Sequence, residues 1–282
     1  MQEKIGIITD STCDIPADFI KKLGIEVLPL RILYKDKEFR DGVDITAEEV
    51  YAQLEDEIPT TSLPGPDEVE ALFLKMKSQG FTHIIVIHIS SGLSGTGQMI
   101  QTVAQQIEGL VIKVIDSKSI SMGLGFIVIE AARAIQRRMN FEAICHYIKS
   151  VQERLSVFFV LGTLEYLKKG GRIGRVSGTI GQLLNIKPII TVDKDGVYST
   201  YSKVRGRKQS IDQLFIAAKE RLSQTASQIA VCYGGAQEEA ASFIKRLEEL
   251  PNIKELIVTT VGPVIGVHTG PGTLGFAVLQ PE

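Results

Sequence analysis

The chain has 282 residues, of which 44% are hydrophobic and 23% are charged. This is the profile of an ordinary globular protein with room for two domains. The 31 Lys and Arg residues nearly balance the 33 Asp and Glu residues, so the formal net charge is −2 and gives no bulk attraction to nucleic acid. The amino-terminal segment lacks the long apolar stretch of a signal peptide, and no run of about 18 apolar residues follows it, so we expect a cytoplasmic protein.

The cysteines and histidines argue against a metal site and against disulfide bonds. Cys13, Cys145 and Cys232 are far apart and odd in number, and none belongs to a C-x-x-C pair. His83 and His88 lie five residues apart on one predicted strand, so their side chains point to opposite faces. We therefore expect neither a metal ion nor another cofactor.

The first half of the chain alternates predicted strands and helices. Apolar runs predict strands at residues 5–9, 25–33, 82–89 and 111–115, with Pro29 favouring an edge position for the second. Predicted helices separate them, and Thr46 and Glu49 have the spacing of a capping box before one. This alternation predicts a mainly parallel sheet flanked by helices, with ligands beyond the carboxyl ends of the strands. The polar turns at Asp10, Ser94 and Asp116 leave from that edge.

The second half has a different character, and we place the domain boundary near residue 155. Residues 121–135 predict a buried helix, which belongs with an N-terminal α/β domain of residues 1–155. Asp195-Gly196 is a strong signal for a β-hairpin, and hairpins imply antiparallel pairing. Residues 156–282 therefore predict an α+β domain with a mainly antiparallel sheet.

Two loops rich in hydroxyl groups stand before predicted helices. Residues 90–97 (SSGLSGTG) and the shorter Thr60-Thr61-Ser62 offer side-chain hydroxyls, and the helix starts offer free N–H groups. Neither loop contains Lys or Arg, which a phosphate usually recruits, so both better suit a carboxylate or an uncharged headgroup. The plainer interpretation is that these hydroxyls only cap helices.

The segment around Ser94 also comes close to a serine-hydrolase motif. Gly92-Leu93-Ser94-Gly95-Thr96 matches G-x-S-x-G except at its last position. A hydrolase or a phosphotransferase that acts on an acyl or phosphate ester with Ser94 and His268 therefore remains an alternative function.

Residues 262–272 concentrate glycines and prolines around His268. This composition predicts a backbone held in tight turns, neither helix nor strand. A lone histidine is most often structural, but in a rigid loop its imidazole could also donate to an anion.

Basic residues gather in two turns, at residues 168–175 and 203–208. They could form an ordinary solvated face, or a docking patch for an acidic partner or for membrane phosphates.

Taken together, these motifs resemble the DegV family over the whole chain. They are Asp10-Ser11-Thr12, residues 59–62, residues 90–96, Asp116-Ser117-Lys118, residues 170–173, residues 185–188 and residues 268–272. The resemblance implies two α/β domains with a lipid buried between them. It also implies a fatty-acid-binding subunit that shelters the acyl chain and presents its carboxylate to a separate ATP-dependent fatty acid kinase, for phospholipid synthesis. The chemistry would then take place on the partner, and this chain would have no catalytic residue.

The resemblance assigns roles to individual residues. Thr61, Ser62, Ser94 and His268 would bind the carboxylate of a fatty acid of about C16–C18, such as palmitate, stearate or oleate. Gly95, Thr96 and Gly270 would support these loops. Arg172, Arg205 and Arg207 would face the kinase. The protein would also contact a membrane surface transiently, and it would not bind nucleic acid.

Three positions depart from the family pattern. Leu63, Gly97 and Gly174 stand where relatives often carry Gln, Tyr and Ser. The loss of a tyrosine at Gly97 could widen the pocket or change the preference for chain length. None of the three departures removes a predicted carboxylate donor.

Overall fold

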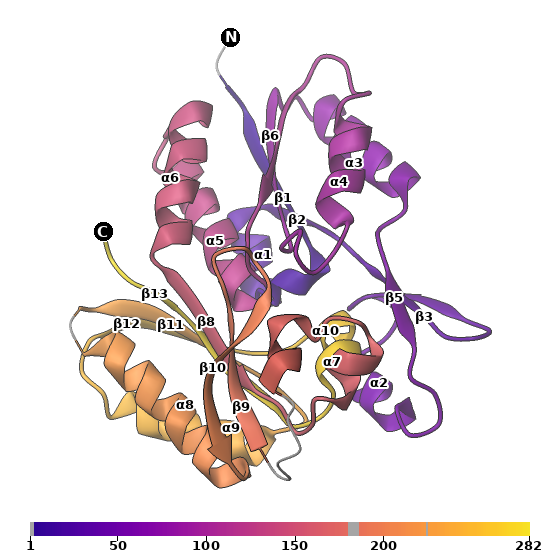
Figure 1. The fold of residues 1–282 in the computed structure, drawn as a ribbon. Helices are drawn as coiled ribbons and strands as arrows, with labels where there is room; N and C mark the ends of the chain where they lie inside the picture. Colours follow the sequence, from indigo (N-terminus) through magenta and orange to yellow (C-terminus); the bar gives the residue numbers. More distant parts are fainter. Residues whose placement is uncertain (1–2, 180–185, 224) are drawn as a thin grey trace.

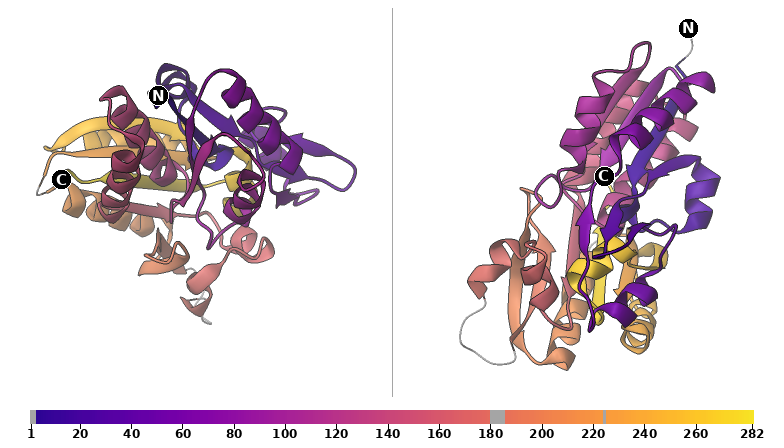
Figure 2. Two further views of the ribbon diagram at one scale, coloured as in Figure 1. Left: turned by 90° about the horizontal axis from the view of Figure 1, so that it is seen from above. Right: turned by 90° about the vertical axis from the view of Figure 1, so that its right-hand side faces the viewer.

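The computed structural model describes residues 3–179, 186–223 and 225–282. Asn185, in the motif at residues 185–188, lies outside these ranges. The parallel sheet of the first half and the larger sheet of the second half form two lobes, and residues 31–62 of the first half lie beside residues 263–269 of the second (Figures 1 and 2). Helix α6 (Phe141–Glu153) ends just before strand β8 (Leu155–Val160), so the predicted boundary after residue 155 lies at the first residue of β8.

The first lobe contains the predicted parallel sheet. Its strands are β1 (Ile5–Asp10), β2 (Ile25–Leu28), β6 (His83–His88) and β7 (Val111–Asp116), in the spatial order β2-β1-β6-β7. Residues of α3 (Pro66–Ser78) and α4 (Thr96–Ala104) pack on one face. Residues of α1 (Ala17–Leu23), α5 (Met122–Gln136) and α6 pack on the other. The prediction of a mainly parallel sheet between helices is confirmed.

Residues 25–33 were predicted as one strand, and this prediction is wrong. Pro29 supplies no N–H, and the N–H of Leu30 donates to Ser11 Oγ at 3.0 Å, so the chain leaves the first sheet after β2. It continues as β3 (Arg31–Leu33), which pairs with β4 (Glu38–Arg40) and β5 (Thr60–Ser62) in a small antiparallel sheet. Helix α2 (Ala47–Gln53) follows β4 and begins with the predicted capping box of Thr46 and Glu49.

The second lobe is built on six strands in the order β10-β9-β8-β13-β11-β12. All neighbours are antiparallel except β11 and β12, and β9 and β10 form the hairpin that Asp195-Gly196 predicts. Helices α8 (Arg207–Leu222) and α9 (Gln237–Glu248) share a core with the outer face. The strands are β9 (Ile186–Val192), β10 (Tyr198–Arg205), β11 (Ser227–Gly234), β12 (Ile253–Thr260) and β13 (Thr273–Leu279).

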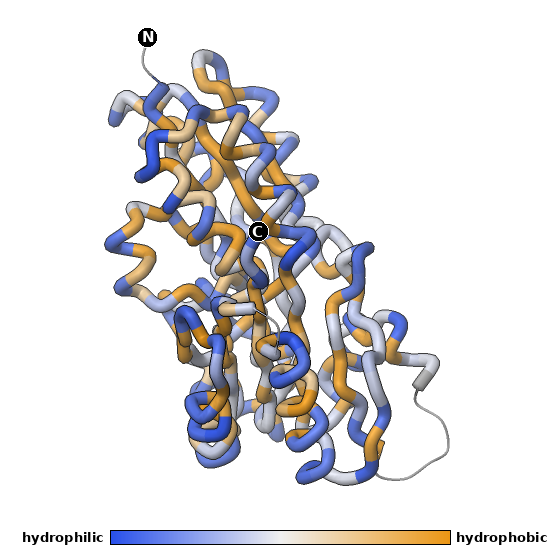
Figure 3. The backbone as a smooth tube through the Cα atoms, turned by 90° about the vertical axis from the view of Figure 1, so that its left-hand side faces the viewer, coloured by the Kyte–Doolittle hydropathy of each residue, from blue (hydrophilic) through white to orange (hydrophobic). Residues whose placement is uncertain are grey.

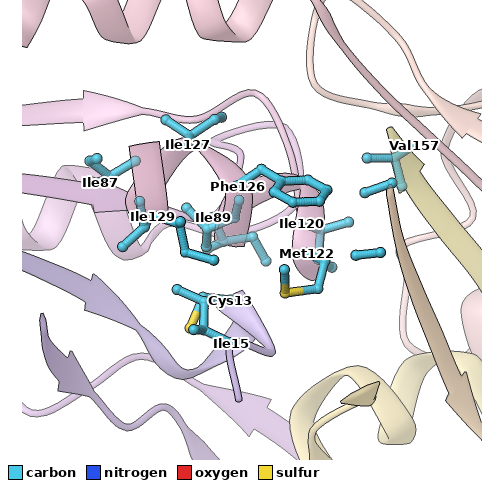
Figure 4. Packing of buried hydrophobic residues seen from close by; sticks show 14 of the residues in the cluster. Cys13, Ile15, Ile87, Ile89, Ile120, Met122, Phe126, Ile127, Ile129 and Val157 are labelled. Carbon is cyan, nitrogen blue, oxygen red and sulfur yellow. The ribbon is translucent and has the colours of Figure 1, made fainter. Parts of the chain in front are cut away.

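Helix α5 lies between the two sheets and joins their cores. It contacts β1 and β6 of the first sheet and β8, β11 and β13 of the second. Residues of both lobes meet around it, such as Ile87 from β6 and Val157 from β8 (Figure 4). Gly125 allows close approach, because a Cβ there would lie 2.7 Å from the carbonyl oxygen of Cys13. Hydrophobic positions run along the interior strands, whereas hydrophilic positions gather at the outer turns (Figure 3).

Candidate functional site

His268 lies on a short helix, so the prediction of tight turns for residues 262–272 is wrong in part. Helix α10 (Pro263–Thr269) begins with a proline in its first turn, where a missing N–H is tolerated. Gly270 ends it with a φ of 67°, in the left-handed region that glycine adopts easily. The glycines and prolines therefore mark the two ends of a helix, and His268 stands in its last turn.

Two buried carboxyl groups of the first lobe hold the start of α10. The N–H of Gly262 donates to Asp14 Oδ1 at 2.8 Å, and the N–H of Val264 donates to Asp41 Oδ1 at 2.9 Å. Asp14 also bonds Ser121 Oγ at 2.5 Å. Burial raises the pKa of Asp14 to about 8 and that of Asp41 to about 6. These contacts fix α10, and with it His268, against the first lobe.

The imidazole of His268 is paired with Thr61 of strand β5. Thr61 Oγ1 and His268 Nε2 are 2.8 Å apart, although 207 residues separate them in the chain. Burial, with the positive charge of Arg172 as a second cause, lowers the pKa of His268 to about 4, so the ring is neutral at pH 7. If Nε2 carries the hydrogen, it donates to Thr61 and leaves the Thr61 O–H free to donate to a ligand.

Helices α7 (Glu165–Lys169) and α10 interlock through two glycines. A Cβ on Gly170 would overlap the imidazole of His268, and a Cβ on Gly270 would overlap the ring of Tyr166. Each helix thus fills a space that a glycine of the other segment leaves open. Arg172 follows directly, and its guanidinium donates to the carbonyl oxygens of Gly170 at 2.7 Å and Leu93 at 3.3 Å.

Ser94 lies in the loop that precedes α4. Its Oγ is 2.8 Å from Thr96 Oγ1 and accepts from the Thr96 N–H at 3.3 Å, while Gly95 stands at the N-cap of the helix. A Cβ on Gly97 would overlap the ring of His88. The space that a tyrosine at position 97 would need is therefore filled by His88, and Gly97 does not border the cavity described next.

The polar residues face one small cavity between the lobes. Thr61, Ser94, Arg172 and His268 all line it. A second small cavity adjoins it and is almost entirely apolar, with walls that include Phe158, Phe159, Phe276 and Ala277. Ile120, Tyr198 and Ile265 border both cavities, and we call this shared boundary the neck. A cavity with polar side chains on its wall thus adjoins a hydrophobic one.

Three predicted site residues lie elsewhere. Ser62 is exposed, because side chains alternate along β5 and Thr61 takes the inward position. Arg205 is exposed at the end of β10. Arg207 forms an ion pair with Glu239 at 2.5 Å, so its charge is already partnered.

Several residues of the site were not predicted from the sequence. Arg172 was assigned to a docking face, yet it lines the polar cavity. Asp14, Asp41 and Tyr198 are not among the site residues that the sequence predicts. In the sequence, Asp14 and Asp41 are acidic residues beside an apolar residue or a glycine. Such neighbours are common in any protein, so they do not mark a site.

Within residues 3–179, 186–223 and 225–282, no three His, Cys, Asp or Glu side chains are grouped to hold a metal ion. No helix in the same ranges combines the length and hydrophobicity that crossing a bilayer requires.

Comparison with known proteins gives a consistent result. The family model described as "Uncharacterised protein, DegV family" matches residues 4–280. A DegV domain-containing protein of Clostridium acetobutylicum is 46% identical over 279 residues, which are 99% of each chain. A fatty-acid-binding DegV family protein of Thermus thermophilus superposes with a TM-score of 0.92 at 30% identity, covering 99% of this chain and 100% of the other.

A third comparison concerns a named lipid. A stearic-acid-binding protein of Eubacterium ventriosum superposes with a TM-score of 0.90 at 28% identity, covering 98% of each chain. Since the family model spans nearly the whole sequence and a relative of full length is 46% identical, the chain belongs to the DegV family.

Proposed function

We propose that this protein binds one long-chain fatty acid, of about C16–C18, such as palmitate, stearate or oleate. The carboxylate would lie in the polar cavity and the acyl chain in the apolar cavity. The observation that carries the proposal is the position of Thr61, Ser94 and His268 around a cavity that adjoins a hydrophobic one. The fatty-acid-binding relatives with the same fold support it.

The chemistry of the polar cavity suits a single negative charge. Thr61 and Ser94 each have a neighbour that can orient the hydroxyl group, namely His268 and Thr96. Arg172 adds one positive charge, while His268 stays neutral. A carboxylate needs such donors, because its desolvation would otherwise offset the gain from burying the chain, which is about 0.8 kcal/mol per methylene. A phosphate, with nearly two charges, would lack a second cation.

The fatty acid would then be presented to a partner fatty acid kinase, which would form the acyl phosphate. Arg172 lines the carboxylate cavity and Arg205 is exposed, so a partner that reaches the carboxylate would approach the basic segments. Transient contact with a membrane surface would allow loading.

A hydrolase has less support. Its mechanism needs Ser94 and His268 within hydrogen-bonding reach of each other. In the described part of the chain, Ser94 Oγ bonds Thr96 and His268 Nε2 bonds Thr61. No observation on the structure favours turnover by this chain alone.

Mass spectrometry of the lipid extracted from the purified protein tests the first step. We expect about one fatty acid per chain, and added palmitate should stabilise the delipidated protein against heat, as ligands that bind only the folded state do. Delipidated protein whose melting temperature is unchanged by palmitate and oleate would contradict the proposal. For the partner, acyl phosphate should be trapped with hydroxylamine only when this protein, ATP and a fatty acid kinase are all present.

A further inference from the structure

Tyr198 occupies the neck between the two cavities. It stands at the start of β10, immediately after the hairpin turn, and is only 3% exposed. Its ring packs edge-on against Phe159, with the centroids 5.2 Å apart. Its two companions at the neck, Ile120 and Ile265, are aliphatic. The phenol is therefore the one hydroxyl group at the point where a ligand would pass from the polar chamber into the apolar one.

The other hydroxyl groups on the cavity walls already have partners. In the apolar cavity, Ser121 bonds Asp14, Thr269 Oγ1 donates to a carbonyl oxygen of its own helix, and Thr273 Oγ1 donates to the carbonyl oxygen of Gly270. In the polar cavity, Thr12 bonds Asp10 and the hydroxyls of Thr61 and Ser94 are paired as described above. Each of these hydroxyl groups therefore has a protein partner.

The hydroxyl of Tyr198 forms no hydrogen bond with any residue in the described part of the chain. Burial raises its pKa, so the phenol keeps its proton at neutral pH and can both donate and accept. The hydroxyls of Tyr34 and Tyr51 also lack partners, but they are enclosed by protein atoms and border neither cavity. Buried polar groups are nearly always satisfied, so the unpaired phenol on a cavity wall indicates a partner on the ligand.

We propose that Tyr198 selects fatty acids that carry a hydroxyl group close to the carboxylate, with 3-hydroxy fatty acids as the preferred class. This inference rests on the proposed function and specifies its ligand. With the carboxylate at Thr61 and Ser94, the first few carbons of the chain pass the neck. A methylene group there leaves the phenol unpaired, whereas a hydroxyl group satisfies it. Sites built to bond a hydroxyl group discriminate against the analogue that lacks it.

Isothermal titration of delipidated protein with palmitate and with 3-hydroxypalmitate tests this inference. We expect wild type to bind the 3-hydroxy acid roughly tenfold more tightly, the equivalent of one hydrogen bond. Tyr198→Phe should bind both acids equally, without weaker binding of palmitate. Tyr201→Phe is the matched control, since Tyr201 lies on the same strand but is 40% exposed, and it should keep the preference of wild type.

Other outcomes would overturn the inference in distinguishable ways. Equal binding of the two acids by wild type, or a preference that survives Tyr198→Phe, would remove the role of Tyr198. Weaker binding of palmitate by Tyr198→Phe would place the phenol on the carboxylate instead. 12-Hydroxystearate should bind no more tightly than stearate, because its hydroxyl group would lie beyond the neck. A gain in affinity as large as that of the 3-hydroxy acid would refute the placement of Tyr198 near the carboxylate. Binding of neither palmitate nor 3-hydroxypalmitate by wild type would overturn the proposed function itself.

Discussion

Replacement of Thr61 by valine tests the candidate carboxylate site most directly. Valine keeps the branched shape that suits strand β5 but removes the hydroxyl that pairs with His268 Nε2 at 2.8 Å. The variant therefore loses one donor to the carboxylate and leaves a buried imidazole nitrogen without its partner. We expect weaker binding of fatty acid with the fold retained.

The magnitude follows from the chemistry of the lost bond. A hydrogen bond to a charged group is worth about 1.5–3 kcal/mol, so palmitate should bind roughly 10- to 150-fold more weakly. For 1-hexadecanol, which has the same chain and no charge, the loss should be about half as large in free energy. The difference between the two ligands separates an effect on the carboxylate from a general change in the cavity.

Titration of delipidated protein with both ligands provides the measurement. Thr60→Val is the matched control, because Thr60 is the exposed neighbour on the same strand, and its affinity should equal that of wild type. Thr61→Val protein that binds palmitate as tightly as wild type would refute the assignment. An equal loss of palmitate affinity in Thr61→Val and Thr60→Val would show that binding depends on the strand as a whole and not on the Thr61 hydroxyl.

Two further variants test the supporting structure. Burial raises the pKa of Asp14 from 3.8 to about 8, so its contribution to stability is complete below pH 3.8 and is lost as the pH rises to about 8. In urea unfolding between pH 5 and pH 9, the free energy of unfolding of Asp14→Asn should decline less with pH than that of wild type. If Asp18→Asn, a change at an exposed residue, reduced the decline equally, the decline would not come from Asp14. Gly97→Ala should lower the free energy of unfolding by about 1–3 kcal/mol through overlap with His88. Gly95→Ala, with open space around its Cβ, should be nearly neutral, and equal losses would argue against the overlap.

The overall architecture could be predicted from the sequence because its signals are local. Apolar runs that alternate with helical segments predict a parallel sheet, and Asp195-Gly196 predicts the hairpin of the second lobe. The errors came where local signals conflict with tertiary contacts. Pro29 interrupts a long apolar run, and the sequence does not reveal that the two pieces join different sheets. Pro263 and Gly270 look like loop residues, but they bound a helix.

The candidate site could be predicted only in part, for a physical reason. The hydroxyl loops were visible as sequence motifs, and the resemblance to a family named His268. The pairing of Thr61 with His268 depends on how β5 and α10 pack, and no local pattern carries that information. The exposure of Ser62 follows from strand alternation, which a segment interpreted as a loop could not show. Tyr198 and Asp41 acquire their importance only from burial.

The interlock of α7 and α10 links the candidate carboxylate pocket to a basic surface. His268 rests on Gly170 and Tyr166 rests on Gly270, so neither helix can shift without displacing the other. Lys168 and Lys169 stand in the last turn of α7, next to that contact. A displacement imposed on these lysines from outside would therefore be transmitted to the imidazole within a single helical turn. The pocket and the surface are thus joined by two packed helices, although about 100 residues of chain lie between them.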